Sequence, residues 1–236
     1  MTKLKYLPVN WVDGMKINKN HFISTEDALV DKINVTASIN LNAINYGLLP
    51  IDPGTSDSIE FSLDIDDQDV IELRLIKCSA ITYGGIIIDY DSFDDSSDSQ
   101  SVFSIQDKID IRDKKDGEYY VILSVNPFKR IPAGPADPEE SPPRNPHIMP
   151  SYKIGIVKVN EINIKELGKY FIPIGIINIA KGDALLSDKY IPPCTSVSSH
   201  KKLINFHNKL SEFWSKIEMD ITTIISKIHV KRQQST

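Results

Sequence analysis

Side chains that commonly carry chemistry are scattered along this sequence. Five histidines could bind a metal ion or act as general bases, and they are His21, His147, His200, His207 and His229. None of them lies in an HExxH or similar spacing, so the sequence predicts no metal site. GxSxG, P-loop and GxGxxG motifs are also missing, and Tyr83-Gly84-Gly85 precedes a predicted strand, whereas a phosphate-binding loop opens a helix.

Carboxylates are concentrated in the middle of the chain, where they could act as acid–base pairs or calcium ligands. The runs 64–69 and 89–91 resemble calcium-binding loops in their aspartates, but both lack the glycine and the glutamate that such loops require. No basic or histidine residue beside the paired carboxylates would fix their roles. We therefore expect no catalytic residue, no cofactor and no enzyme activity.

The two cysteines, Cys78 and Cys194, are far apart and have no partner pattern, which argues against a disulfide framework or a zinc site. With 41% hydrophobic and 25% charged residues, the 236-residue chain is typical of a globular protein with one large domain, or one domain plus an appendage. It shows neither a signal peptide nor an apolar run of about eighteen residues. These features predict a cytoplasmic protein that does not insert into a membrane.

Charge is distributed unevenly along the chain. Residues 52–118 hold eighteen Asp/Glu against six Lys/Arg, while residues 189–236 hold eight Lys/Arg against three Asp/Glu. Nucleic-acid binding requires a basic surface that neutralises phosphates, so the acidic middle argues against a nucleic-acid partner.

A helix is predicted after Ser24-Thr25-Glu26-Asp27, where a capping residue precedes acids in the first turn. Apolar residues then recur every three or four positions, at Val30, Ile33, Ala37, Leu41 and Ile44. Tyr46-Gly47 is predicted to end this helix, and a turn containing Asp52 follows.

From residue 59 onward the apolar period changes to two, which predicts β-strands over 59–65 and 71–75. Further strands are predicted over 84–90, 102–111, 119–126, 152–159 and 170–180. Asp116-Gly117, between 109–111 and 119–123, favours a hairpin. Because no helix separates the strands, we expect a mainly β fold with an antiparallel β-sandwich, preceded by the helical segment and followed by a long helix.

Residues 127–150 contain eight of the fourteen prolines. Since proline has no backbone N–H to donate a hydrogen bond to a neighbouring strand, this stretch predicts a long extended loop or arm. Either a plain surface excursion or an arm that grips a partner fits the pattern.

Residues 201–230 predict a long helix with a heptad seam formed by Leu210, Trp214, Ile217, Ile221, Ile224 and Ile228. Isoleucine at both core positions favours trimers or tetramers over dimers. One alternative is that this apolar stripe packs on the β domain of its own chain. The strict 3.5-residue period favours self-association.

A short run near the start, residues 11–22, gathers aromatic, methionine and glycine residues. Trp11, Met15 and Phe22 offer large contact areas for a partner protein, although burial in the chain's own core is the simpler explanation.

Several of these segments together resemble the TssK (VasE-type) baseplate subunits of the bacterial type VI secretion system. The resemblance is carried by Trp11-x-x-Gly14-Met15 with His21-Phe22, by Tyr46-Gly47-Leu48, and by Tyr190-Ile191-Pro192-Pro193-Cys194 before the long helix. It covers roughly residues 8–50 and 150–225, while 55–145 matches only in its strand-rich character.

The resemblance implies a structural protein without enzymatic activity. Family members are trimers whose N-terminal β-sandwich, similar to the shell domain of siphophage receptor-binding proteins, docks onto a baseplate wedge of TssF and TssG. A helical bundle follows, and a C-terminal domain contacts the cytoplasmic part of the membrane complex. By this resemblance, residues 1–190 form the shell-like domain and residues 191–236 open the trimeric bundle. The resemblance implies that the partner-binding residues are Trp11, Gly14, Met15, His21 and Phe22.

The chain departs from the family pattern because it ends at Thr236, in or just after the first bundle helix. We therefore expect either a shortened form or a short natural variant. Two other classes stay open: a phage-type trimeric adhesin or carbohydrate-binding β-sandwich, and a hydrolase with an acidic pair.

Overall fold

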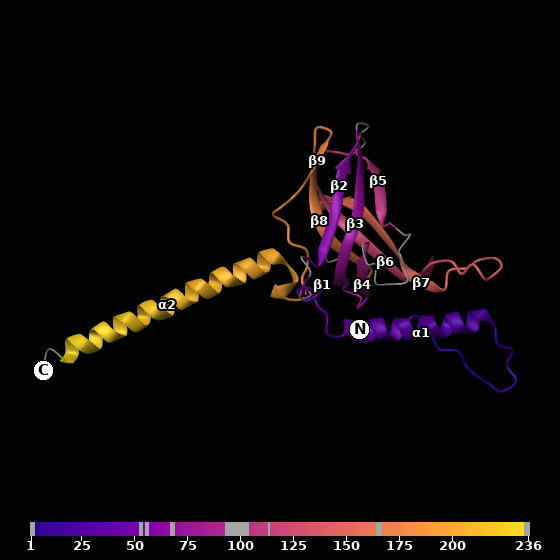
Figure 1. The fold of residues 1–236 in the computed structure, drawn as a ribbon, viewed down its shortest axis with the longest axis horizontal. Helices are drawn as coiled ribbons and strands as arrows, with labels where there is room; N and C mark the ends of the chain where they lie inside the picture. The colour runs from indigo at the N-terminus through magenta and orange to yellow at the C-terminus, as the bar shows by residue number, and fades with distance from the viewer. Residues whose placement is uncertain are drawn as a thin grey trace.

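Two antiparallel β-sheets pack face to face, one helix lies across an end of this sandwich, and a second helix projects away from it (Figure 1). The computed structural model describes residues 3–51, 54, 57–66, 69–92, 104–112, 114–163 and 167–233. The predicted mainly β fold, with a helix before the sandwich and a long helix after it, is confirmed.

The first sheet is built around one long central strand, β3 (Val70–Ile81), which pairs with four shorter strands. These are β1 (Gly47–Leu48), β2 (Ile59–Ile65), β4 (Ile87–Asp91) and β5 (Gln106–Asp110). The second sheet has the order β7-β6-β8-β9, with β6 (Gly117–Ala133), β7 (His147–Lys158), β8 (Phe171–Ala180) and β9 (Asp183–Leu186). In the described connections lie the short 3₁₀ helices η1 (Val159–Glu161) and η3 (Val197–Ser199).

The core lies between the sheets because alternate side chains of the central strands point inward. Leu73 and Leu75 of β3 are fully buried with Leu123 of β6 and Ile172 of β8. Burial of each such side chain stabilises the fold by about 1.5–3 kcal/mol. This alternation is what the sequence period of two predicted.

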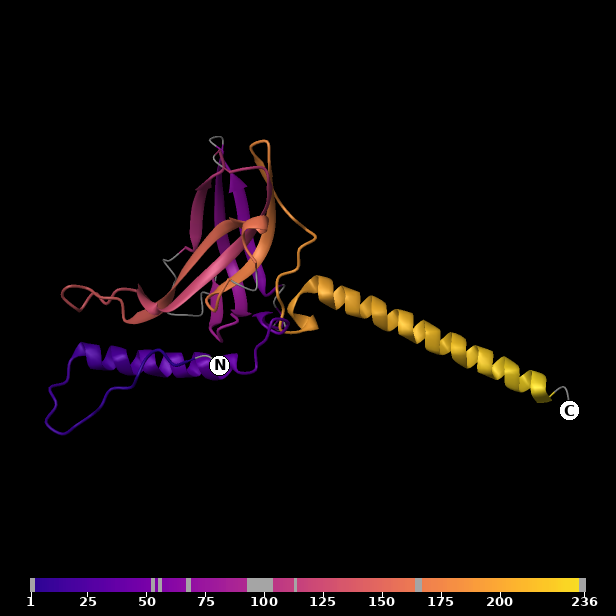
Figure 2. The same ribbon diagram turned by 180° about the vertical axis from the view of Figure 1, so that it is seen from behind.

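Helix α1 (Lys19–Ser38) lies across the end of the sandwich from which the β3–β4 turn protrudes (Figures 1 and 2). Gly85 in this turn has a φ of +80°, and a Cβ there would lie 2.2 Å from the Asn34 carbonyl oxygen of α1. Only glycine allows this approach, so the turn and the helix are in direct backbone contact.

The predicted bounds of this first helix are wrong. It begins at Lys19, because Asn18 and not Ser24 caps it, and it ends at Ser38, so Leu41 and Ile44 lie outside it. Ile33 and Ile44 are exposed, which shows that the apolar stripe from Val30 to Ile44 is not a core face.

The predicted Asp116-Gly117 hairpin is also wrong. β5 pairs with β3 in the first sheet, whereas β6 pairs with β7 and β8 in the second. The Asp-Gly turn therefore carries the chain from one sheet to the other. β1 and β9 were not predicted, and the turn residue Asp52, part of the run 64–69 and residues 102–103 of a predicted strand lie outside the described residues.

The proline-rich segment forms a β6–β7 arm, which we define as residues 127–150. β6 continues to Ala133 and β7 begins at His147, so the base of the arm is a two-stranded ribbon and residues 134–146 form the loop at its tip (Figure 1). A bulge between Asn126 and Arg130 takes up Pro127. Strand β8 pairs with β6 only as far as Ser124, so Pro127 and Pro132 lie where one edge of β6 is not paired with β8.

Candidate functional site

The N-terminal segment folds back along α1 as a strap, which we define as residues 3–18 (Figures 1 and 2). The Asp31 side chain on α1 accepts hydrogen bonds from the backbone N–H groups of Lys5 and Tyr6, the latter at 3.0 Å. Asp31 is only 8% exposed. Hydrogen bonds to a charged group contribute about 1.5–3 kcal/mol, so Asp31 is the main polar attachment of the strap.

A second contact fastens the far end of the strap to the first turn of α1. The Trp11 ring lies 6.0 Å from the His21 ring and 6.4 Å from the Phe22 ring, measured between centroids. Trp11 is nevertheless 48% exposed and Phe22 57% exposed. These aromatic residues contact each other, and neither is buried in the sandwich core.

Gly14 forms the turn between Trp11 and the helix. Its φ is +78°, and the N–H of Met15 donates to the carbonyl oxygen of Val12 at 3.3 Å. Met15 is half-buried. The five residues of the predicted partner site are thus brought to one place, at the strap's turn and the start of α1.

His21 also has a structural role that sequence reasoning missed. Its Nδ1 accepts a hydrogen bond from the Asn18 N–H at 3.3 Å, while the Asn18 side chain caps the helix. The two residues form a capping box in which histidine replaces the usual Glu or Gln. The spacing of three residues between Asn18 and His21 was the available signal.

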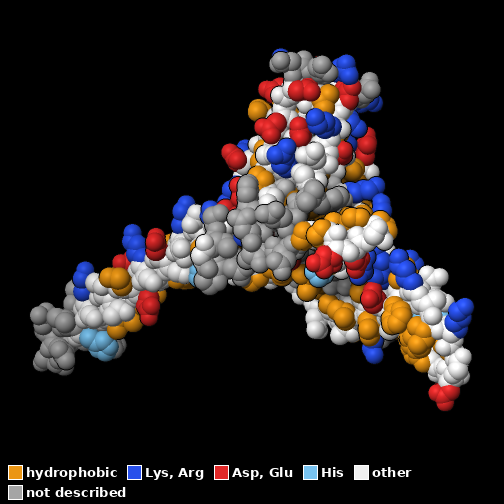
Figure 3. Space-filling view, turned by 45° about the vertical axis from the view of Figure 1, so that its right-hand side comes forward, with side chains coloured by type: hydrophobic (Ala, Val, Ile, Leu, Met, Phe, Trp, Pro, Cys, Tyr) orange, Lys and Arg blue, Asp and Glu red, His pale blue; other side chains and the backbone are white. Residues whose placement is uncertain are grey.

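The strap and the first half of α1 together carry a strap surface, defined by exposed apolar side chains. Its members are Leu4, Leu7, Trp11, Val12, Ile17 and Phe22. Figure 3 shows hydrophobic side chains gathered along the limb of the molecule that α1 and the strap form. A concentration of exposed apolar side chains of this kind is typical of protein–protein interfaces.

The β6–β7 arm is fastened to the same region. The Arg130 guanidinium binds the Asp27 carboxylate at 2.6 Å, pairs with Glu26, and donates to the Ile23 carbonyl oxygen at 3.3 Å. Phe128 stacks on Tyr6 of the strap with ring centroids 4.4 Å apart. Strap, helix and arm therefore form one connected unit.

Helix α2 (Lys201–Gln233) carries the predicted heptad seam and does not lie against the sandwich (Figures 1 and 2). Ile217 is half-buried, and the other five seam residues, Leu210, Trp214, Ile221, Ile224 and Ile228, are between 40% and 63% exposed. The alternative that this stripe packs on its own β domain is therefore wrong.

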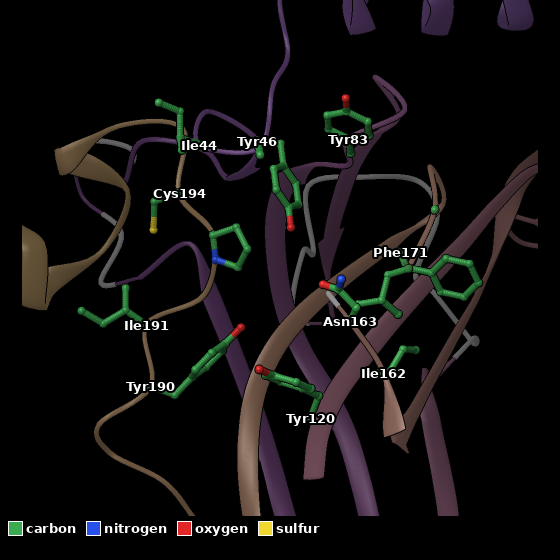
Figure 4. A pocket seen from close by; sticks show the side chains of 14 residues that line it. Ile44, Tyr46, Tyr83, Tyr120, Ile162, Asn163, Phe171, Tyr190, Ile191 and Cys194 are labelled. Atoms are coloured by element: carbon green, nitrogen blue, oxygen red, sulfur yellow. The ribbon is translucent and has the colours of Figure 1, made fainter. Parts of the chain in front are cut away.

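A third feature is a hollow of about 780 Å³ beside the segment that leads into α2. Tyr46, Tyr83, Tyr120 and Tyr190 line it together with apolar side chains and Cys194 (Figure 4). Burial raises the pKa of Cys194 to about 11 and also raises the pKa values of Tyr46 and Tyr190. These three groups are protonated at neutral pH, so none of them is a ready nucleophile or general base, and the described lining can bind an apolar group.

Within the part of the chain that the structure describes, no three His, Cys, Asp or Glu side chains are grouped so that they could hold a metal ion. None of the described helices has the length and apolarity needed to span a bilayer.

Comparison with solved structures shows what this architecture is similar to. A crystal structure of TssK matches with a TM-score of 0.51 and 16% identity, over 86% of this chain and 45% of that chain. A structure of the baseplate complex from the type VI secretion system matches with a TM-score of 0.53 and 13% identity, over 93% of this chain and 70% of that chain.

The chain has the TssK fold. This confirms, at the level of fold, the resemblance that the sequence predicted. The chain spans about half the length of the first TssK structure that it matches. No protein-family model and no curated protein sequence matches it.

Proposed function

We propose that this chain is a TssK-type baseplate subunit of a type VI secretion system, with a structural and not an enzymatic role. The observation that carries the proposal is the free-standing helix α2, whose apolar seam lies exposed on a TssK fold. In this proposal residues 1–190 form the shell-like domain and residues 191–236 open a helical bundle in the cytoplasm.

Trimerisation is proposed to occur through the α2 seam. Full burial of a leucine or isoleucine side chain contributes about 1.5–3 kcal/mol. Because the seam residues are already about half covered, the six side chains offer roughly 5–9 kcal/mol per protomer. This is comparable with the cost of association, about 4–15 kcal/mol. Isoleucine at both core positions favours bundles of three or four helices, and the resemblance to TssK favours the three-helix bundle of a trimer.

A double substitution on α2 tests this proposal. Ile221→Asp/Ile224→Asp places two charges on the seam, and Thr222→Asp/Thr223→Asp places the same charges on the adjacent outer positions. We expect light scattering to show a trimer for the parent chain and the outer variant, and a monomer for the seam variant. A parent chain that is monomeric at micromolar concentration would contradict the proposed trimer.

Docking onto the TssF/TssG wedge is proposed to use the strap surface, with the β6–β7 arm as a second contact. Trp11 and Phe22 combine large area with high exposure, as interface hot spots require. Met15 lies in the turn beside them and can adapt to a partner surface. The wider proposal includes an indirect link, through the wedge, to the cytoplasmic part of the membrane complex.

A pull-down with the TssF and TssG proteins of the same genome tests this docking. We expect Trp11→Ala/Met15→Ala/Phe22→Ala to lose the wedge while circular dichroism shows an intact fold. Ile87→Ala/Leu185→Ala, which truncates exposed apolar side chains on the sandwich, is the matched control and should retain it. Equal retention by both variants would refute the role of the strap surface.

A further inference from the structure

A groove of about 530 Å³ lies where the strap crosses the base of the β6–β7 arm. The strap contributes Lys5 and Tyr6, β6 contributes five residues that include Phe128 and Lys129, β7 contributes Ser151 and Lys153, and Tyr170 also lines the groove. The strap wall of the groove is therefore held in place by the Asp31 hydrogen bonds and by the contact between Tyr6 and Phe128.

Three lysines, Lys5, Lys129 and Lys153, line this groove, and all three are exposed. Among the described residues none of them has a carboxylate within ion-pair distance. The neighbouring Arg130, by contrast, is neutralised by Glu26 and Asp27. The result is a concentrated positive charge on a chain whose net charge is −5.

The floor of the groove is aromatic. Tyr6 and Phe128 stack with ring centroids 4.4 Å apart, and the Lys5 amino group lies 5.1 Å from the Tyr6 ring centroid and 5.9 Å from that of Phe128. These cation–π contacts hold the ammonium group over the aromatic floor. A ligand that offers both carboxylates and an apolar or aromatic side chain would satisfy the lysines and the floor together.

We propose that this groove is a docking site for an acidic peptide segment of a partner protein, in which carboxylates flank an aromatic side chain. Charge complementarity identifies the occupant, since none of the three lysines forms an ion pair with a carboxylate in the described part of the chain. The β6 and β7 strands give the site a rigid frame. Lys5 and Tyr6 make it dependent on the strap.

A nucleic acid fits this surface less well. Nucleic-acid affinity depends on many phosphate contacts along a basic face, whereas this groove offers three lysines on an acidic protein. The site is separate from the α2 seam and from Trp11 and Phe22. It does not require the proposed baseplate role.

Fluorescence anisotropy with the full chain tests the proposal. The probe is a short fluorescein-labelled peptide in which glutamates flank one phenylalanine, and the control peptide has glutamine in place of every glutamate. We expect the glutamate peptide to bind and its affinity to fall as salt increases. Equal binding of the glutamine peptide would overturn the proposal.

Two matched charge reversals complete the test. Lys129→Glu/Lys153→Glu should weaken binding of the glutamate peptide by at least about fivefold. Lys181→Glu/Lys189→Glu changes the net charge equally on exposed residues outside the groove and should bind like the parent chain. Equal weakening by both variants, or binding of oligothymidylate in preference to the peptide, would overturn the proposal.

Discussion

Replacement of Asp31 by alanine should release the strap without unfolding the sandwich. Asp31 is the buried acceptor for the Lys5 and Tyr6 N–H groups, and no other described side chain accepts hydrogen bonds from these two amides. Each hydrogen bond to a charged group contributes about 1.5–3 kcal/mol, but the released N–H groups bind water, so we expect a loss of about 2–4 kcal/mol in strap attachment.

Amide hydrogen exchange followed by mass spectrometry measures this loss directly. Since 1.4 kcal/mol corresponds to a factor of ten, exchange of the Lys5 and Tyr6 amides should accelerate by roughly 30- to 1000-fold. Exchange in β3, and in β6 up to Ser124, should not change, because these segments form the sandwich core and do not contact the strap through it. Asp13→Ala, which removes an exposed carboxylate from the same strap, is the control.

The reasoning would be refuted if exchange of the Lys5 and Tyr6 amides were the same in the Asp31→Ala variant and the parent chain. It would also be refuted by equal acceleration in β3 and β6, because Asp31 would then support the whole domain and not the strap alone.

Three further predictions concern the contacts around the sandwich. Arg130→Ala should lower the free energy of unfolding, measured by urea denaturation, by about 1–3 kcal/mol, because the substitution leaves the partly buried Asp27 unpaired. The control Lys129→Ala should change the free energy of unfolding by less than about 0.5 kcal/mol. Gly85→Ala should accelerate hydrogen exchange throughout α1, since its Cβ would collide with backbone atoms of the helix; unchanged exchange would mean that the turn can shift. Iodoacetamide should modify Cys194 more slowly in the folded than in the urea-unfolded chain at pH 8.5, because burial raises the pKa of this thiol and only the thiolate reacts. The rate of modification of the folded chain should keep rising toward pH 11. Equal rates in both states would show that the pKa of the thiol is not raised by folding.

Long, periodic elements could be predicted from the sequence. Helix α2 keeps one heptad seam over most of its length, and apolar residues alternate with a period of two in β2 and β3. Both periods can be read from the sequence because they do not depend on which other segments pack against these elements. The strand pairing could not be predicted, because the Asp116-Gly117 turn has the residue types of a hairpin turn. The strands on its two sides nevertheless pair in different sheets, β5 with β3 and β6 with β8, and this depends on contacts between residues far apart in the sequence.

Short elements and unusual caps were missed for a different reason. β1 has two residues and β9 has four, which is too short for any period to show. The start of α1 depends on a capping box that uses His21, and the conventional signal at Ser24 lies within the helix. The partner residues Trp11, Met15 and Phe22 were recognised by type, but their placement depends on how the strap folds back along α1, and the Asp31 contact that holds the strap joins residues far apart in the sequence. The lysine groove depends on the same contact, so no local pattern indicated it.

Native mass spectrometry of the chain co-expressed with TssF and TssG tests the central claim most directly. A TssK-type baseplate subunit should be recovered in a complex that holds both wedge proteins and a trimer of this chain. Recovery of this chain only as a monomer, with TssF and TssG absent from every species, would contradict the account.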